Sequence, residues 1–190
     1  MIEKPFFRGC LIAIGGNEDR ENDLVVLKRV VQEVGKADYK VGVITTASEV
    51  PEQRGEDYRQ VFTTLKASGI EILNIKDRAQ ANNATLAKTL EDTDLIFLVG
   101  GDQLRLTTII GGSLIFEVIQ NRLENGAIIA GTSAGAAVFS DTMIYDGKSE
   151  EGLIKGSVLT TSGFGFVENV VFDTHFNVRG RIGRLVQIIN

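Results

Sequence analysis

Short apolar runs alternate with longer amphipathic segments through most of this chain, and this alternation strongly limits the folds open to it. A run of four to eight apolar residues bounded by glycine is typical of a strand buried on both faces. Strands that alternate with helices favour a parallel sheet covered by helices on both sides. The expected strands are 10–16, 39–48, 70–75, 94–101 and 127–131.

The amphipathic segments between these runs have helical spacing and end at residues that commonly stop helices. The expected helices are 21–35, 56–69, 83–92 and 113–126. Gly35, Gly69 and Gly126 are the expected C-terminal caps, and Asn83 is the expected N-terminal cap. The glycine-rich, β-branched segment 153–176 indicates irregular strands and turns. We expect a single α/β domain over 1–190.

Composition excludes several classes of protein. The 190 residues are 43% hydrophobic, which is enough for one compact domain. A net charge of −5 argues against a nucleic-acid partner. The single cysteine, Cys10, lies in an apolar run and is expected to be buried, and it can form no internal disulfide. No signal peptide and no apolar run near ~18 residues is visible, so we expect a cytoplasmic protein that does not bind a membrane.

The segment "GTSAG" at 131–135 fits the G-x-S-x-G pattern of a nucleophile elbow. In such an elbow a sharp strand-to-helix turn exposes the serine, and small neighbours avoid clashes. The helix that follows directs its N-terminus at the site, where it stabilises negative charge. The pattern therefore predicts that Ser133 is a nucleophile. A glycine-rich turn without chemistry is the alternative reading.

A nucleophilic serine needs a base, and His175 is the only histidine of the chain. It precedes three arginines, Arg179, Arg181 and Arg184, which could form a fork-shaped site for carboxylates or a solvated basic helix face. In α/β-hydrolases an acid lies between serine and histidine in the sequence. No strand-end acid stands out in the 42 positions from Ser133 to His175, so that fold fits poorly.

Two further glycine turns follow expected strands. The segment "LIFLVGGDQ" at 95–103 ends a strand where parallel sheets bind ligands, although a simple turn remains possible. The segment "IGGNEDR" at 14–20 lacks the G-x-G-x-x-G spacing of a dinucleotide site. One cysteine and one histidine cannot form a zinc site. We expect no cofactor and no metal.

Taken together, "GGNEDR", "FLVGGDQ", "GTSAGAAVFS" and "DTHFNVRGRIGRL" resemble the signature blocks of cyanophycinases, serine peptidases related to aspartyl dipeptidase. The resemblance covers nearly the whole chain in the same order. It implies a three-layer α/β sandwich with a mostly parallel sheet, related to class I glutamine amidotransferases. It also implies hydrolysis of cyanophycin, a poly-aspartate that carries arginine on its side-chain carboxylates, to β-Asp-Arg dipeptides released from a chain end.

The resemblance also implies roles for individual residues. Ser133 would be the nucleophile and His175 its base, and the N–H groups of Gly101 and Ala134 would form the oxyanion hole. The substrate pocket would be lined by Gln103, Asp173, Thr174, Arg179, Arg181 and Arg184. The arginines would bind the carboxylates of an aspartate- and arginine-containing peptide or polymer.

Two departures from the family pattern alter these expectations. Thr174 stands where the family usually has glutamine, so the substrate preference is expected to differ. The carboxylate that orients the histidine lies, in the family, beyond the point where this chain ends at Asn190. We therefore expect a domain that lacks its C-terminal segment and that, alone, is a poor or inactive hydrolase. Either a second chain supplies that segment or the isolated chain associates with itself, and we expect a homodimer. A dipeptidase for small aspartyl peptides and a non-catalytic binder of acidic ligands are the alternative functions.

Overall fold

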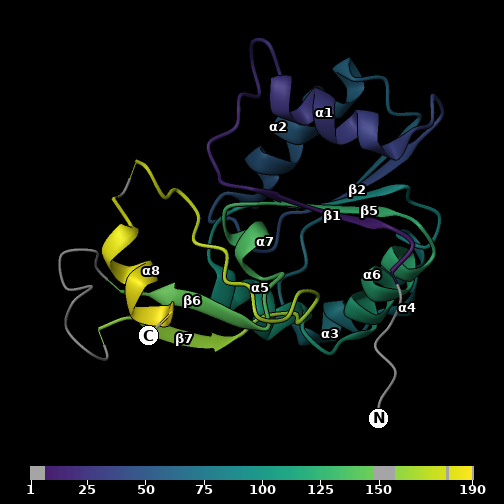
Figure 1. Ribbon diagram of the computed structural model, residues 1–190. Helices are drawn as coiled ribbons and strands as arrows, with labels where there is room; N and C mark the ends of the chain where they lie inside the picture. Colours follow the sequence, from purple (N-terminus) through teal and green to yellow (C-terminus); the bar gives the residue numbers. More distant parts are fainter. Residues whose placement is uncertain (1–6, 148–156, 179, 190) are drawn as a thin grey trace.

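A five-stranded sheet with parallel pairing throughout forms the centre of the molecule in a computed structural model (Figure 1). The structure describes residues 7–147, 157–178 and 180–189. The strand order is β1-β5-β4-β2-β3. The strands are β1 (Cys10–Ile14), β2 (Lys40–Ile44), β3 (Gly69–Leu73), β4 (Leu95–Leu98) and β5 (Ile128–Thr132). The expected parallel α/β sheet is confirmed.

Helices cover both faces of this sheet (Figure 1). Helices α1 (Val25–Val34) and α2 (Pro51–Thr64) lie on one face. The other face carries α3 (Arg78–Ala81), α4 (Ala84–Lys88), α5 (Gln103–Ile110), α6 (Leu114–Glu124) and α7 (Ala134–Ala137). This is the expected three-layer arrangement.

Alternate residues of the central strands supply two separate cores. In β4, Leu95 and Phe97 pack with α1 and α2, whereas Ile96 and Leu98 pack with α4 to α7. Side chains of a strand alternate between the faces of a sheet, so a strand that is apolar throughout can stabilise both layers. The central strands are buried along nearly their full length, as their composition predicts.

The edge strands behave differently, and here one expectation is wrong. Cys10 is exposed, not buried. It begins β1, which pairs with β5 alone, and the other edge of β1 has no partner among the described strands. An apolar run at a sheet edge cannot be enclosed as fully as one at its centre. Composition does not distinguish a strand at the edge of the sheet from a strand at its centre.

Several helix boundaries also differ from the expected ones. Helix α1 begins at Val25 instead of residue 21, because the Asp19 carboxylate accepts the N–H groups of Glu21, Asn22 and Leu24 and so holds them in a turn. Gly35 ends this helix with a φ of 68°, as expected.

Helix α2 begins at Pro51, five residues early, because proline is favoured in the first turn. It ends at Thr64, and Gly69 begins β3 instead of capping the helix. Asn83 caps α4 as expected, by accepting the N–H groups of Thr85 and Leu86, but that helix ends at Lys88. The helix α5, capped by the Asp102 carboxylate, was not predicted.

The chain after α7 forms a smaller unit beside the main sheet. Strands β6 (Thr142–Asp146) and β7 (Leu159–Ser162) pair in antiparallel fashion. Strand β7 lies within the segment 153–176 that was expected to form irregular strands, whereas β6 was not predicted. They are followed by helix α8 (Ile182–Ile189). Within the described ranges, no helix has the length and apolar character that crossing a membrane requires.

Candidate active site

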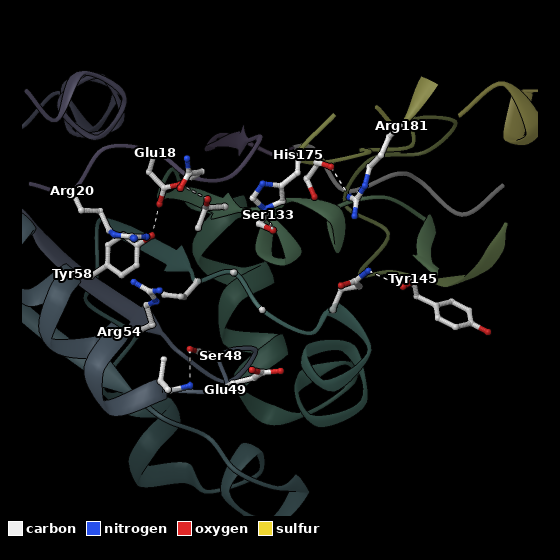
Figure 2. A pocket seen from close by; sticks show the side chains of 18 of the residues that line it. Glu18, Arg20, Ser48, Glu49, Arg54, Tyr58, Ser133, Tyr145, His175 and Arg181 are labelled. Atoms are coloured by element: carbon white, nitrogen blue, oxygen red, sulfur yellow. Dashed lines mark hydrogen bonds between the residues drawn. The ribbon is translucent and has the colours of Figure 1, made fainter. Parts of the chain in front are cut away.

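A cavity of about 600 Å³ opens at the carboxyl ends of the parallel strands (Figure 2). The turns after β1, β2, β4 and β5 contribute residues to its wall, as do α2 and the β6 region. Parallel sheets commonly bind ligands at this edge. Ser133 and His175 lie at the centre of the cavity in Figure 2, with Arg20 and Arg54 on one side and Arg181 on the other.

Ser133 lies in the tight turn between β5 and α7. Its φ of 52° and ψ of −114° lie in a region that non-glycine residues rarely adopt. Its backbone N–H donates to Ile14 O over 3.0 Å, and its carbonyl accepts the N–H groups of Ala136 and Ala137. These contacts hold the strained turn, which is the geometry of a nucleophile elbow.

The two glycines of the elbow are required by close packing. A Cβ on Gly131 would lie 2.1 Å from Gly135 O, and a Cβ on Gly135 would lie 2.1 Å from Leu98 O. Helix α7 therefore sits directly against the backbone of β4 and β5. Any larger side chain at either position would move the helix, and the serine at its N-terminus with it.

His175 lies beside this serine although 42 positions separate them. Its Nε2 is 2.9 Å from Ser133 Oγ, a hydrogen-bond distance. The His175 backbone N–H donates to Gly15 O over 2.8 Å, and its φ is 53°. In the tautomer that carries its proton on Nδ1, Nε2 can accept the hydroxyl proton, as a general base must.

The proposed oxyanion donors lie at the ends of β4 and β5. Ala134 is the first residue of α7, and the first N–H groups of a helix have no partner inside it. Gly101 has a φ of 148°, and a Cβ there would lie 1.9 Å from Ala47 O, so only glycine fits. Gly101 lines the cavity. Oxyanion binding by these two groups stays a prediction.

Some of the residues expected to bind substrate line the cavity, and others are buried beside it. Gln103 lines the cavity and donates its side-chain amide to the carbonyls of Ile144 and Tyr145, over 3.1 and 3.2 Å. Thr174 also lines the cavity but is 9% exposed. Asp173 has a side chain that is 1% exposed and forms an ion pair with Arg181 over 3.4 Å.

Of the three expected arginines, Arg181 contributes to the cavity wall. Its Nη1 donates to Thr174 O over 2.6 Å, so this side chain also supports the segment that carries His175. Arg184 belongs to α8, and Arg179 lies outside the described residues. Binding of substrate carboxylates by these arginines stays a prediction. The expectation that a protein carboxylate beyond Asn190 orients His175 also stays a prediction.

Sequence reasoning missed a group of polar residues on the other side of Ser133 (Figure 2). The Glu18 carboxylate accepts hydrogen bonds from the Tyr58 hydroxyl and, over 2.5 Å, from Thr132 Oγ1. Burial, and secondarily the charge of Glu18, raises the pKa of Tyr58 far above its usual value, so the hydroxyl keeps its proton. Glu18 belongs to the segment that lacks dinucleotide-site spacing and counts among the family's signature blocks, but no role was expected for it. Tyr58 was expected only as part of the helix 56–69.

Within the described ranges, no three histidine, cysteine, aspartate or glutamate side chains form a group that could hold a metal ion. Ser133 and His175 place a hydroxyl and a base within hydrogen-bond distance, an arrangement that suits acyl-group chemistry.

Known proteins show matching sequences and folds. Residues 10–190 match the sequence model of peptidase family S51. A cyanophycinase from Trichormus variabilis is 34% identical over 181 residues, which make up 95% of this chain and 61% of the relative. A cyanophycinase from Synechococcus elongatus is 35% identical over 184 residues, 96% of this chain and 57% of the relative. The chain thus spans about three fifths of the length of these relatives.

A solved structure supports the same fold. The crystal structure of a peptidase from an acI-B1 Actinobacterium superposes with a TM-score of 0.74 at 22% sequence identity. The match covers 98% of this chain and 78% of that one.

Proposed function

Because this chain belongs to peptidase family S51, we propose that it is a serine-type exopeptidase that degrades cyanophycin to β-Asp-Arg dipeptides. The observation that carries the catalytic part is the 2.9 Å distance between Ser133 Oγ and His175 Nε2 at a strained strand-to-helix turn. The cyanophycinases among its relatives support the substrate.

The proposed reaction uses the groups at the centre of the cavity. Ser133 Oγ attacks the carbonyl carbon of the scissile amide while its proton passes to His175 Nε2. The N–H groups of Gly101 and Ala134 bind the oxyanion, the C–N bond breaks, and His175 gives the proton to the departing amine. Water then hydrolyses the acyl ester by the reverse sequence of proton transfers.

The charges of the cavity support a substrate that carries both carboxylates and guanidinium groups. Arg54, which pairs with Asp57, and Arg181, which pairs with Asp173, lie in its wall. A guanidinium has five N–H donors in a planar fork, so it can also bind a second carboxylate. Glu49 and Asp146, both exposed, also line it and suit a guanidinium. A polymer of aspartate and arginine presents both charges at regular intervals.

Incubation of cyanophycin with the purified chain, alone and together with a polypeptide that supplies the expected C-terminal segment, tests this proposal. We expect β-Asp-Arg dipeptides by mass spectrometry, and Ser133→Ala should lower the rate by at least about 10³-fold. Ser68→Ala is the matched control, because Ser68 Oγ bonds Tyr39 O away from the cavity.

Other results would redirect or refute the proposal. Hydrolysis of aspartyl dipeptides without attack on the polymer would favour the dipeptidase alternative. Binding of aspartyl peptides without turnover would favour a non-catalytic binder. An S133A variant that kept more than a few per cent of the wild-type rate would rule out Ser133 as the nucleophile.

A further inference from the structure

The turn between β1 and α1 contacts both members of the serine–histidine pair. Ile14 O accepts the Ser133 N–H, and Gly15 O accepts the His175 N–H. A Cβ on Gly16 would lie 2.5 Å from the His175 ring, so the imidazole lies directly against this backbone. The distance between the two catalytic side chains therefore depends on where this turn is held.

Glu18 joins this turn to the elbow and to helix α2. Its two carboxylate oxygens have separate partners, Tyr58 on α2 for Oε1 and Thr132 at the end of β5 for Oε2. The residue is 8% exposed, Tyr58 is fully buried and Thr132 is 4% exposed. A carboxylate buried to this extent is stabilised by accepting such hydrogen bonds, and an unpartnered one would be costly.

We propose that Glu18 is a positioning residue, which fixes the nucleophile elbow relative to His175 through the Thr132 hydroxyl. The inference rests on the proposed function and adds to it a residue with no part in the bond-making steps. Thr132 immediately precedes Ser133, so its hydrogen bond to Glu18 restrains the turn that carries the nucleophile. Backbone strain such as that of Ser133 persists only where surrounding contacts over-determine the conformation.

Tyr58 completes the arrangement from the helix side. Its hydroxyl keeps its proton at neutral pH and donates a hydrogen bond to Glu18 Oε1, so both carboxylate oxygens have a partner. The Arg20 guanidinium lies 5.8 Å from the centre of the Tyr58 ring, which adds a cation–π contact to the same group. Two hydrogen-bond donors from separate segments, Tyr58 and Thr132, thus hold one buried carboxylate next to the elbow, and Arg20 packs on the ring of the first.

Three near-isosteric substitutions separate this role from a general effect on packing. Thr132→Val removes the hydroxyl and keeps the branched shape, Tyr58→Phe removes a hydroxyl alone, and Glu18→Gln removes the charge. Thr132→Ser keeps the hydrogen bond and serves as the rescue variant. The matched controls are Thr93→Val and Tyr39→Phe, which remove buried hydroxyls that donate to the backbone carbonyls of Leu90 and Leu65, away from the elbow.

The measurement is labelling of Ser133 by a small fluorophosphonate, followed by intact mass, with the folded fraction determined by urea unfolding. We expect E18Q and T132V to lower the maximal labelling rate about 10-fold to 100-fold, the scale of a misplaced reacting group. In both variants, the probe concentration that gives half-maximal labelling should stay within about twofold of the wild-type value. T132S, T93V and Y39F should label within about threefold of the wild type, and Y58F should fall between the groups.

The double variant E18Q/T132V should label no more slowly than the slower of the two single variants, because both remove the same contact. Multiplied effects would contradict the proposal, as would a T132V that labels as fast as T93V. A wild-type chain that the probe does not label at Ser133 would instead overturn the proposed function itself, and the positioning role with it. Y58F and E18Q keep the test decisive if T132V does not fold.

Discussion

Replacement of Gly135 by alanine tests whether the elbow depends on direct contact between α7 and β4. The added Cβ would lie 2.1 Å from Leu98 O and 2.7 Å from the Leu98 carbonyl carbon. Both atoms belong to the backbone of a fully buried strand, so neither can rotate away. The helix must move instead.

The size of that movement follows from ordinary contact distances. Carbon and carbonyl oxygen approach to about 3.3–3.6 Å, so α7 has to shift by roughly 1.2–1.5 Å. Overpacking of this kind costs about 1–3 kcal/mol, whereas alanine gains only about 0.5–1 kcal/mol over glycine in a helix. We therefore expect a net loss of about 0–2.5 kcal/mol. A displacement of about 1 Å at Ser133 should lower the rate about 10²-fold.

Urea unfolding and fluorophosphonate labelling measure the two effects separately. Gly69→Ala is the matched control, because its Cβ would contact only the flexible Lys40 side chain, at 3.4 Å. We expect the control to label as the wild type does and to change stability by less than about 0.5 kcal/mol. A Gly135→Ala variant with wild-type stability and wild-type labelling would refute the close-packing argument.

Two further predictions concern charged residues. Charge removal by glutamine at Arg179, Arg181 or Arg184 should each weaken aspartyl-dipeptide binding at least about tenfold in calorimetry, since a charge-assisted hydrogen bond contributes about 1.5–3 kcal/mol. R181Q alone should also slow Ser133 labelling, because Arg181 supports Thr174 next to His175. Unchanged affinity for aspartyl dipeptides in all three variants would contradict a role of these arginines in substrate binding. Hydrogen bonds from three following backbone N–H groups lower the pKa of Asp19. The wild type should therefore be more stable than Asp19→Asn, and this difference in unfolding free energy should be complete above the usual carboxyl pKa. That difference should disappear as the pH falls toward the lowered pKa of the folded state. A difference between the urea midpoints of the two proteins that stays constant from neutral pH to about pH 2 would refute this prediction.

The sequence by itself determined the layers of the fold and two members of the site. Alternation of apolar runs with helical segments is local information, and it correctly predicted the five parallel strands and the helices on both faces. The elbow was also readable, because its small residues are adjacent in the chain. A single histidine left one choice for a base.

Tertiary structure decided what depends on strand order and on distant contacts. Cys10 is exposed because β1 lies at an edge, and nothing in its own apolar run distinguishes an edge from the centre. Glu18 acquires its role from Tyr58, 40 positions away, and from Thr132, 114 positions away. Periodicity and propensity act over one or two turns of chain, whereas a buried carboxylate is fixed by partners that only the completed sheet brings together.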